Sequence, residues 1–118
     1  MTIESTGKKF EDLVVWQKAK VLTLRLYSIL EDSKDFSFKS QILRASTSVM
    51  NNIAEGNERR TNNEFKYFLF VAKGSSGEVR SMLYLLKELN YVDEDEFNEI
   101  YNMSVEISKM LAGLIKTL

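Results

Sequence analysis

Residues 65–89, FKYFLFVAKGSSGEVRSMLYLLKEL, carry the longest regular helical pattern of the chain. Apolar or small residues recur there in alternating steps of three and four, which places them on one side of a helix packed against antiparallel partners. Just upstream, Thr61 and Glu64 have the spacing of a capping box, which predicts where the helix begins. The positions predicted to face the core are Phe65, Phe68, Ala72, Ser75, Val79, Met82, Leu86 and Leu89.

The same periodicity predicts three further helices. Their apolar stripes run from Val15 to Ile29, from Phe38 to Ile53 and from Phe97 to Leu118. Helices are expected over about 10–31, 38–58, 62–90 and 94–117, with residues 1–9 flexible. Short connections force neighbouring helices to be antiparallel. We therefore predict an all-α fold, an antiparallel up-down-up-down four-helix bundle, as a single domain over residues 1–118.

Three glycines in the predicted helices need an explanation. Either Gly56, as a left-handed cap, or the segment 57–60 is expected to end the second helix. Gly74 and Gly77 fall inside the third helix, where each costs about 1 kcal/mol relative to alanine. The pattern continues on both sides of them, so we expect a neighbouring backbone to approach the helix closely at these two positions.

The composition narrows the class of protein. Proline, cysteine and histidine are all absent, and the formal net charge is −1. The absence of cysteine is compatible with a reducing compartment, and no stretch has the length of a membrane span or the core of a signal peptide. The expectation is a cytoplasmic protein without membrane contact.

Catalytic chemistry finds little support in the sequence. Without histidine or cysteine, the commonest general base, metal ligand and nucleophile are missing. Glu55 and Glu58 resemble a di-metal motif that lacks its histidine, and the acidic run 93–96 is explained by helix capping. We expect no enzyme, no cofactor and no metal. A metal-dependent enzyme remains an alternative that elemental analysis would test.

A row of cations is the most suggestive functional feature. Such a row could follow a nucleic-acid backbone, either RNA or DNA. The alternative is an ordinary solvated helix face, which the slightly acidic balance of the chain favours. The candidate nucleic-acid contacts are Lys66, Lys73, Arg80 and Lys87, spaced by seven residues, with Arg59 and Arg60 ahead of them.

Two further groups of residues are candidates for association. Apolar side chains away from the predicted seams suggest a homo-oligomer interface, because they exceed what one small bundle can hide. Three charged residues on the second and third helices form either a buried polar network between helices or subunits, or an exposed polar face, and the sequence leaves both open. The interface candidates are Leu43, Met50, Phe70, Tyr84 and Tyr91, and the network candidates are Arg44, Glu55 and Glu78.

Four blocks of the chain resemble the 23S rRNA-intervening-sequence protein family of small bacterial four-helix-bundle proteins. The blocks are residues 10–19, 41–48, 52–56 and 65–78, with Asn52-Ile53-Ala54-Glu55-Gly56 the most specific. The resemblance implies a ring-like homo-oligomer, a pentamer in a related retroelement accessory factor, and a role tied to RNA. One departure is the missing proline in the Asp35–Phe38 turn.

Two hypotheses follow for function. The first is a non-catalytic, homo-oligomeric accessory or scaffold protein associated with RNA. The second is a structural module that binds another protein and no nucleic acid. Salt-sensitive binding would favour the first, and binding that survives high salt and nuclease treatment would favour the second.

Overall fold

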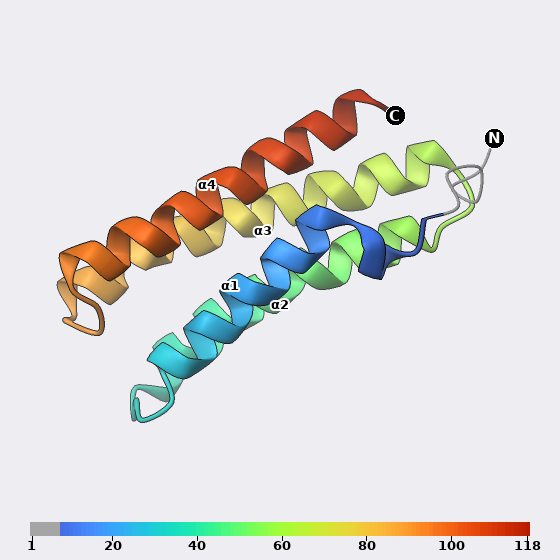
Figure 1. Cartoon of the computed structure of the whole chain (residues 1–118). Coiled ribbons are helices and arrows are strands. Elements are labelled where there is room, and N and C mark those ends of the chain that lie inside the picture. The colour runs from blue at the N-terminus through green and yellow to red at the C-terminus, as the bar shows by residue number, and fades with distance from the viewer. Residues whose placement is uncertain (1–7) are drawn as a thin grey trace.

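The computed structural model describes residues 8–118, which form an antiparallel four-helix bundle (Figure 1). The predicted all-α, up-down-up-down fold is confirmed. Of the segment predicted to be flexible, residues 1–7 lie outside the described residues. The elements are a 3₁₀ turn, η2 (Phe10–Asp12), and the helices α1 (Val14–Ile29), α2 (Phe36–Asn57), α3 (Asn62–Glu88) and α4 (Glu94–Lys116).

Each helix packs along two neighbours, in the cyclic order α1, α2, α3, α4. Helices α1 and α3 therefore lie on one diagonal of the bundle and run parallel, while α2 and α4 lie on the other. In Figure 1 the α1–α2 and α3–α4 connections lie at one end and the α2–α3 connection at the opposite end.

Side-chain caps explain where three of the helices begin. The side chain of Asp35 accepts a hydrogen bond from the backbone N–H of Phe38, so α2 begins two residues earlier than predicted. The predicted capping positions Thr61 and Asp93 are confirmed, because both side chains accept a backbone N–H three residues on. The first helix was expected from residue 10, but a 3₁₀ turn and an extended Leu13 delay it to Val14.

The buried stripe of α3 is wider than the predicted seam. Helix α3 packs against both α2 and α4, so a single row of apolar residues is too narrow to cover both contacts. Leu69 and Leu83, which the prediction omitted, are completely buried. Leu89, which the prediction placed in the core, is half exposed at the end of the helix.

The left-handed cap considered at Gly56 does not form, and α2 ends at Asn57, within the alternative segment 57–60. Within the described chain, no neighbouring backbone approaches Gly74 or Gly77 closely. Gly56 is helical and buried, and a Cβ there would lie 2.8 Å from Phe68 Cβ and 2.9 Å from Phe65 Cδ1. The close approach between helices is therefore at Gly56, between α2 and α3. Gly74 has open space around it instead. The residue with a left-handed backbone is Asn90 (φ 64°), just after α3.

Hydroxyl pairs connect neighbouring helices near the middle of the bundle. Thr23 and Ser46 share a hydrogen bond of 2.7 Å between α1 and α2, and both are buried. Ser48 and Ser75 make a 2.9 Å bond between α2 and α3. A third pair, Ser76 and Ser108 at 2.8 Å, joins α3 to α4. Within residues 8–118, no buried side-chain polar atom lacks a hydrogen-bond partner.

Candidate interaction surfaces

The side of α3 that points away from the core carries no charge over six turns of helix. At 100° per residue, seven positions in steps of three and four lie opposite the buried stripe. All seven are at least partly exposed and uncharged. The next position in the same steps is Glu88, the last residue of the helix, and it is charged. We call this series the α3 face: Asn63, Tyr67, Phe70, Gly74, Gly77, Ser81 and Leu85.

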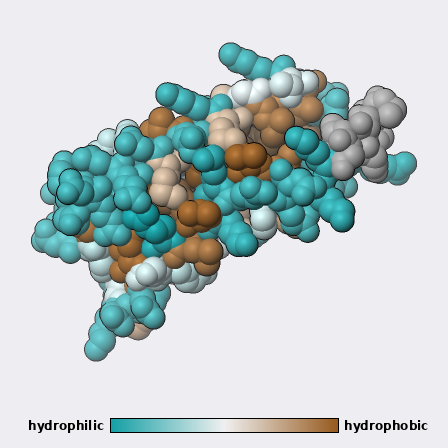
Figure 2. Space-filling view, viewed as in Figure 1, coloured by the Kyte–Doolittle hydropathy of each residue, from teal (hydrophilic) through white to brown (hydrophobic). Residues whose placement is uncertain are grey.

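Helix α1, across the diagonal, has an outward side of the same kind. The Leu24 side chain is 58% exposed there, so the packing of its own bundle does not explain a leucine at this position. Figure 2 shows hydrophobic residues along the α1 side of the molecule, between hydrophilic flanks. The α1 face consists of Val14, Gln17, Val21, Leu24 and Ser28, all exposed and all uncharged.

Helices α2 and α4 differ from this pattern. The outward positions of α4 are mostly charged, as is usual for a solvated helix, whereas those of α2 are mainly polar, with Arg44 and Glu55 charged. Among residues 8–118, α4 contributes no exposed large apolar side chain, and α2 contributes only Phe36 at its first position. The outward series are Ser40, Arg44, Thr47, Asn51 and Glu55 on α2, and Asp95, Glu99, Asn102, Glu106, Lys109, Gly113 and Lys116 on α4.

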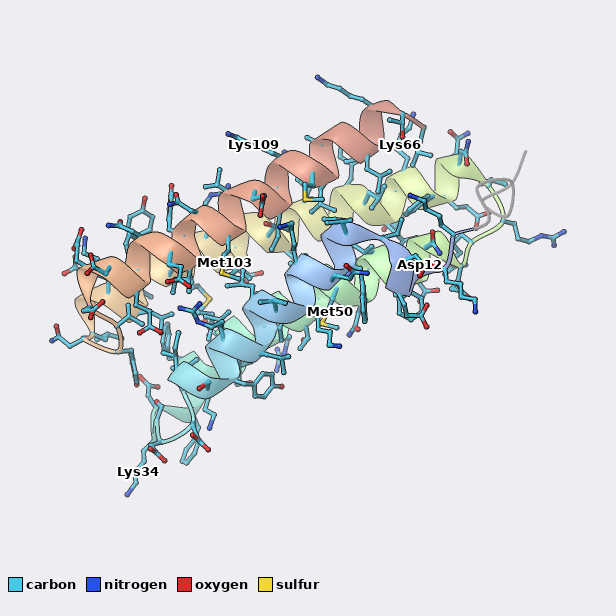
Figure 3. The ribbon with its side chains drawn as sticks, in the orientation of Figure 1. Asp12, Lys34, Met50, Lys66, Met103 and Lys109 are labelled. Atoms are coloured by element: carbon cyan, nitrogen blue, oxygen red, sulfur yellow. The ribbon has the colours of Figure 1, made fainter. Side chains whose placement is uncertain are left out.

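The five residues predicted for an oligomer interface divide into exposed and internal positions. Phe70 is 56% exposed on the α3 face, and Tyr84 is 51% exposed beside it. Leu43 is only 8% exposed, so it belongs mainly to the core of its own bundle. Met50 is half-buried against the core (Figure 3), and Tyr91 hydrogen-bonds Ser33 at 2.6 Å. Sequence periodicity missed the remaining exposed members of the α1 and α3 faces.

Tyr84 lies at the border between α3 and α4. Its ring contacts Phe97 and Tyr101 of α4, with ring centroids 5.4 and 5.6 Å away. Hydrogen bonding with Tyr101 raises the pKa of the Tyr84 phenol.

The three residues considered for a polar network are all exposed. Arg44, Glu55 and Glu78 lie on the outer surfaces of α2 and α3. Glu55 pairs with Arg59, four residues along the same helix, at 3.4 Å. In the described part of the chain, the side chains of Arg44 and Glu78 form neither a hydrogen bond nor an ion pair. The structure thus matches the exposed-face alternative within one chain, and the buried polar contact between α1 and α2 is made by the hydroxyl groups of Thr23 and Ser46 instead.

The predicted row of cations is divided between tied and free side chains. Arg80 donates to Ser108 of α4 at 2.8 Å, and Lys87 pairs with Glu94 at 2.9 Å. Arg59 pairs with Glu55 and Glu64 and lies over the ring of Phe68. These three cations therefore have structural partners. Arg60, Lys66 and Lys73 have no hydrogen bond or ion pair within residues 8–118.

Two cations of α4 extend this side of the molecule. The Ser76–Ser108 bond aligns the first half of α3 with the second half of α4, which carries Lys109 and Lys116. Neither lysine has a hydrogen bond or ion pair in the described residues. Figure 3 shows Lys66 and Lys109 on these neighbouring helices. We call Arg60, Lys66, Lys73, Lys109 and Lys116 the cationic side.

The interior of the described bundle has a small void and no cluster of metal-binding side chains. The enclosed void between the helices, near Ser46 and Ser76, has a volume of about 10 Å³, roughly the least that holds one water. Residues 8–118 hold no group of three acidic, histidine or cysteine residues that could bind a metal ion. None of the described helices is long and apolar enough to cross a membrane.

Comparison with known proteins places this architecture among relatives. A family model described as 23S rRNA-intervening sequence protein matches residues 11–113. A crystal structure from Bacteroides thetaiotaomicron, described as a protein of unknown function from the S23 ribosomal protein family, is similar at 31% identity and a TM-score of 0.79. The match covers 86% of this chain and 98% of that one. None of the curated proteins matches the chain.

Proposed function

Because the chain belongs to the 23S rRNA-intervening sequence protein family, we propose that it is a non-catalytic, homo-oligomeric cytoplasmic scaffold that associates with RNA. The observation that carries the proposal is the pair of uncharged outward faces on α1 and α3. The free cations of α3 and α4 support the RNA part of the proposal. The two parts have separate tests.

Self-association is supported by the distribution of exposed apolar side chains. Large apolar side chains scattered over a surface are ordinary, whereas contiguous apolar patches usually mark association sites. Here nearly all of them lie on α1 and α3 or at the end of α3. Burying these faces against other copies would remove them from water, and this hydrophobic contribution scales with the area buried.

Light scattering coupled to size exclusion tests the oligomer. We expect a mass that is an integer multiple of 13.7 kDa, greater than one, at micromolar concentration. The mass should persist at high salt, because apolar burial is not screened by ions. A mass of one chain over the whole concentration range would remove the homo-oligomeric scaffold from the proposal.

RNA association is supported by charge placement rather than by net charge. The five cations of the cationic side lack intramolecular partners in the described chain. Within residues 65–87 the only acid is Glu78, and within 102–116 it is Glu106. Lysine and arginine side chains of this kind neutralise phosphates and release counterions, so binding should weaken steeply as salt rises.

Charge reversal tests the RNA part. Lys66→Glu, Lys109→Glu and Lys116→Glu together should reduce the affinity for a structured RNA at least tenfold, measured by fluorescence anisotropy at two salt concentrations. The matched control is Lys34→Glu, Lys39→Glu and Arg44→Glu. It changes the net charge by the same amount, but in the α1–α2 connection and on α2, away from the cationic side. Equal losses in both variants would show that only total charge matters and would contradict a specific surface.

The alternative function, a module that binds another protein, is favoured by one separate observation. Tyr27 and Phe36 are exposed outside both faces and line an open groove of about 470 Å³ between α1 and α2. A partner seated there would be captured in high salt and after nuclease treatment. Phe36→Ser should abolish that capture while leaving the oligomer mass and RNA affinity unchanged.

A further inference from the structure

We propose that copies of this chain associate head to tail, with the α3 face of one copy packed along the α1 face of the next. The inference rests on the proposed self-association and adds which surfaces meet, in what orientation and at what level. Such a contact joins two different surfaces, so it leaves a free face at each end and either closes into a ring or continues as a filament.

The glycines of the α3 face point to a contact outside the chain. Neither Gly74 nor Gly77 has a positive φ, so the backbone conformation at these positions suits any residue. A Cβ at Gly74 would meet nothing within 4 Å, and one at Gly77 would meet only the Arg80 side chain at 3.9 Å. Alanine would therefore fit both positions and would favour the helix. The packing of the isolated bundle gives no reason for glycine here, whereas a helix from another molecule would gain a close approach.

The neighbours of the glycines give the α3 face the shape of a shallow saddle. Tyr67 stands about two turns and Phe70 one turn before Gly74, and Leu85 stands about two turns after Gly77. All three side chains are about half exposed or more. A helix lying along α3 would thus meet large apolar side chains near both ends and bare backbone in the middle. The occupant should therefore be a helix with an uncharged side facing α3.

The α1 face of the same chain meets that requirement. It runs from Val14 to Ser28, about 21 Å of helix, against about 27 Å from Tyr67 to Leu85. In the middle of the α1 face, Val21 and Leu24 present branched apolar side chains. These side chains are of a size to fill the gap that the two glycines leave.

The hydroxyl pairs place the two faces at the same level along the bundle. Thr23 is level with Ser46, and Ser48 is level with Ser75, because each pair is hydrogen-bonded across antiparallel helices. Moving two residues along α2 and two residues back along α1 puts Val21 level with Ser75. If a second copy is placed beside the first along the line from α1 to α3, with no shift along the helix axis, Val21 of that copy lies beside Gly74, the neighbour of Ser75.

The charges beside the two faces are complementary under the same displacement. On the side of α3 toward α4 lies the free cation Lys73, and the α4-side edge of the α1 face holds Glu99 and Glu106, each of which already has one cationic partner, Arg25 or Lys18. On the side toward α2, the free carboxylate Glu78 would meet the region of Lys20 in the next copy. Opposite charges at both edges favour this orientation, and reversing one helix would lose the pairing.

Cysteine cross-linking tests the contact directly, because the natural chain contains no cysteine. Val21→Cys and Gly74→Cys are prepared as separate variants, mixed, and oxidised under mild conditions. A second pair, Leu24→Cys with Gly77→Cys, allows for a small difference in axial level. We expect disulfide-linked dimers in the mixtures at least tenfold above either variant alone. The matched control is Asn102→Cys on the charged side of α4, which should give no product with either partner.

Each contrary outcome identifies what fails. If Gly74→Cys alone cross-links as efficiently as the mixture, two α3 faces meet symmetrically and the head-to-tail contact is wrong. If neither mixture cross-links while light scattering still reports an oligomer, the self-association stands and these faces are not its interface. A single-chain mass for the unmodified protein would overturn both. Circular dichroism of each variant checks that the bundle is intact.

Discussion

The two diagonals of the bundle are alike inside and different outside. All four helices bury regular apolar stripes against their neighbours, yet the α1 and α3 faces are uncharged and carry exposed apolar side chains, whereas the outward side of α2 is mainly polar and that of α4 is mostly charged. Folding of one chain requires only the inner stripes. The difference between the diagonals therefore reflects a demand beyond folding, and we assign that demand to contact between copies.

The largest effect is expected from placing a charge on the uncharged diagonal. Phe70→Asp puts a carboxylate in the middle of the α3 face, where burial against another copy would leave it unpaired. We expect the oligomer to dissociate to single chains with unchanged helix content, measured by light scattering and circular dichroism. Asn102→Asp on α4 is the matched control and should leave the mass unchanged. The same change of mass in both variants would contradict the assignment of the contact between copies to the α1 and α3 faces.

A second change tests close packing within the chain. Gly56→Ala would place a Cβ 2.8 Å from Phe68 Cβ and 3.2 Å from the backbone oxygen of Phe65. Relieving this overlap should outweigh the gain in helix propensity, with a net loss of about 1 kcal/mol or more in the free energy of unfolding. Urea denaturation measures it. An unchanged midpoint would mean that α2 and α3 separate easily at this level.

The opposite result is expected at a glycine of the α3 face. Gly74→Ala meets open space in the single chain, so it should stabilise the dilute monomer by up to about 1 kcal/mol through helix propensity. The same methyl group should hinder close approach of another helix and weaken self-association. Thermal denaturation at low concentration and light scattering at high concentration separate the two effects. Stronger association in the variant would contradict a close helix contact at this glycine.

The smallest effect is expected on the charged diagonal. Glu106→Gln removes the ion pair with Lys18, whose atoms are 3.1 Å apart and whose side chains are both largely exposed. Exposed ion pairs contribute about 0–1 kcal/mol, so the unfolding midpoint should shift little and less still at high salt. A large loss of stability would show that the α1–α4 contact depends on charge rather than on apolar packing.

The sequence was sufficient for the bundle because its information is local. Periodicity predicted the helices. The caps at Thr61 and Asp93 predicted where α3 and α4 begin, because each cap side chain bonds a backbone N–H only three residues further along the chain. The predicted first residues of α1 and α2 were wrong, because they depend on single residues that the spacing of apolar positions does not reveal. Asp35 acts as a cap without the full capping-box pattern, and Leu13 interrupts a pattern that otherwise continues.

The surfaces were less predictable because they depend on which helices are neighbours. Gly56 and Gly74 both fall within helical patterns, and only the arrangement of α2 against α3 shows which of them is crowded. Arg80 and Lys87 share the spacing of Lys66 and Lys73, but their partners Ser108 and Glu94 come from α4. A helical wheel centred opposite each core stripe would have revealed the uncharged faces from sequence alone.

The hydroxyl pairs between helices have a consequence for how the chain avoids misalignment. If one helix slid past its neighbour by a single turn, about 5.4 Å, Thr23 would keep its bond to the Ala19 carbonyl, but the buried Ser46 hydroxyl would lose its partner. An unsatisfied buried group costs about 1–3 kcal/mol, a sizeable share of the stability of a small domain. Apolar stripes alone tolerate such slippage, whereas these hydrogen bonds fix the axial position of each helix relative to its neighbour. Every copy would then present its outer surfaces at the same height, which a repeating assembly of identical parts requires.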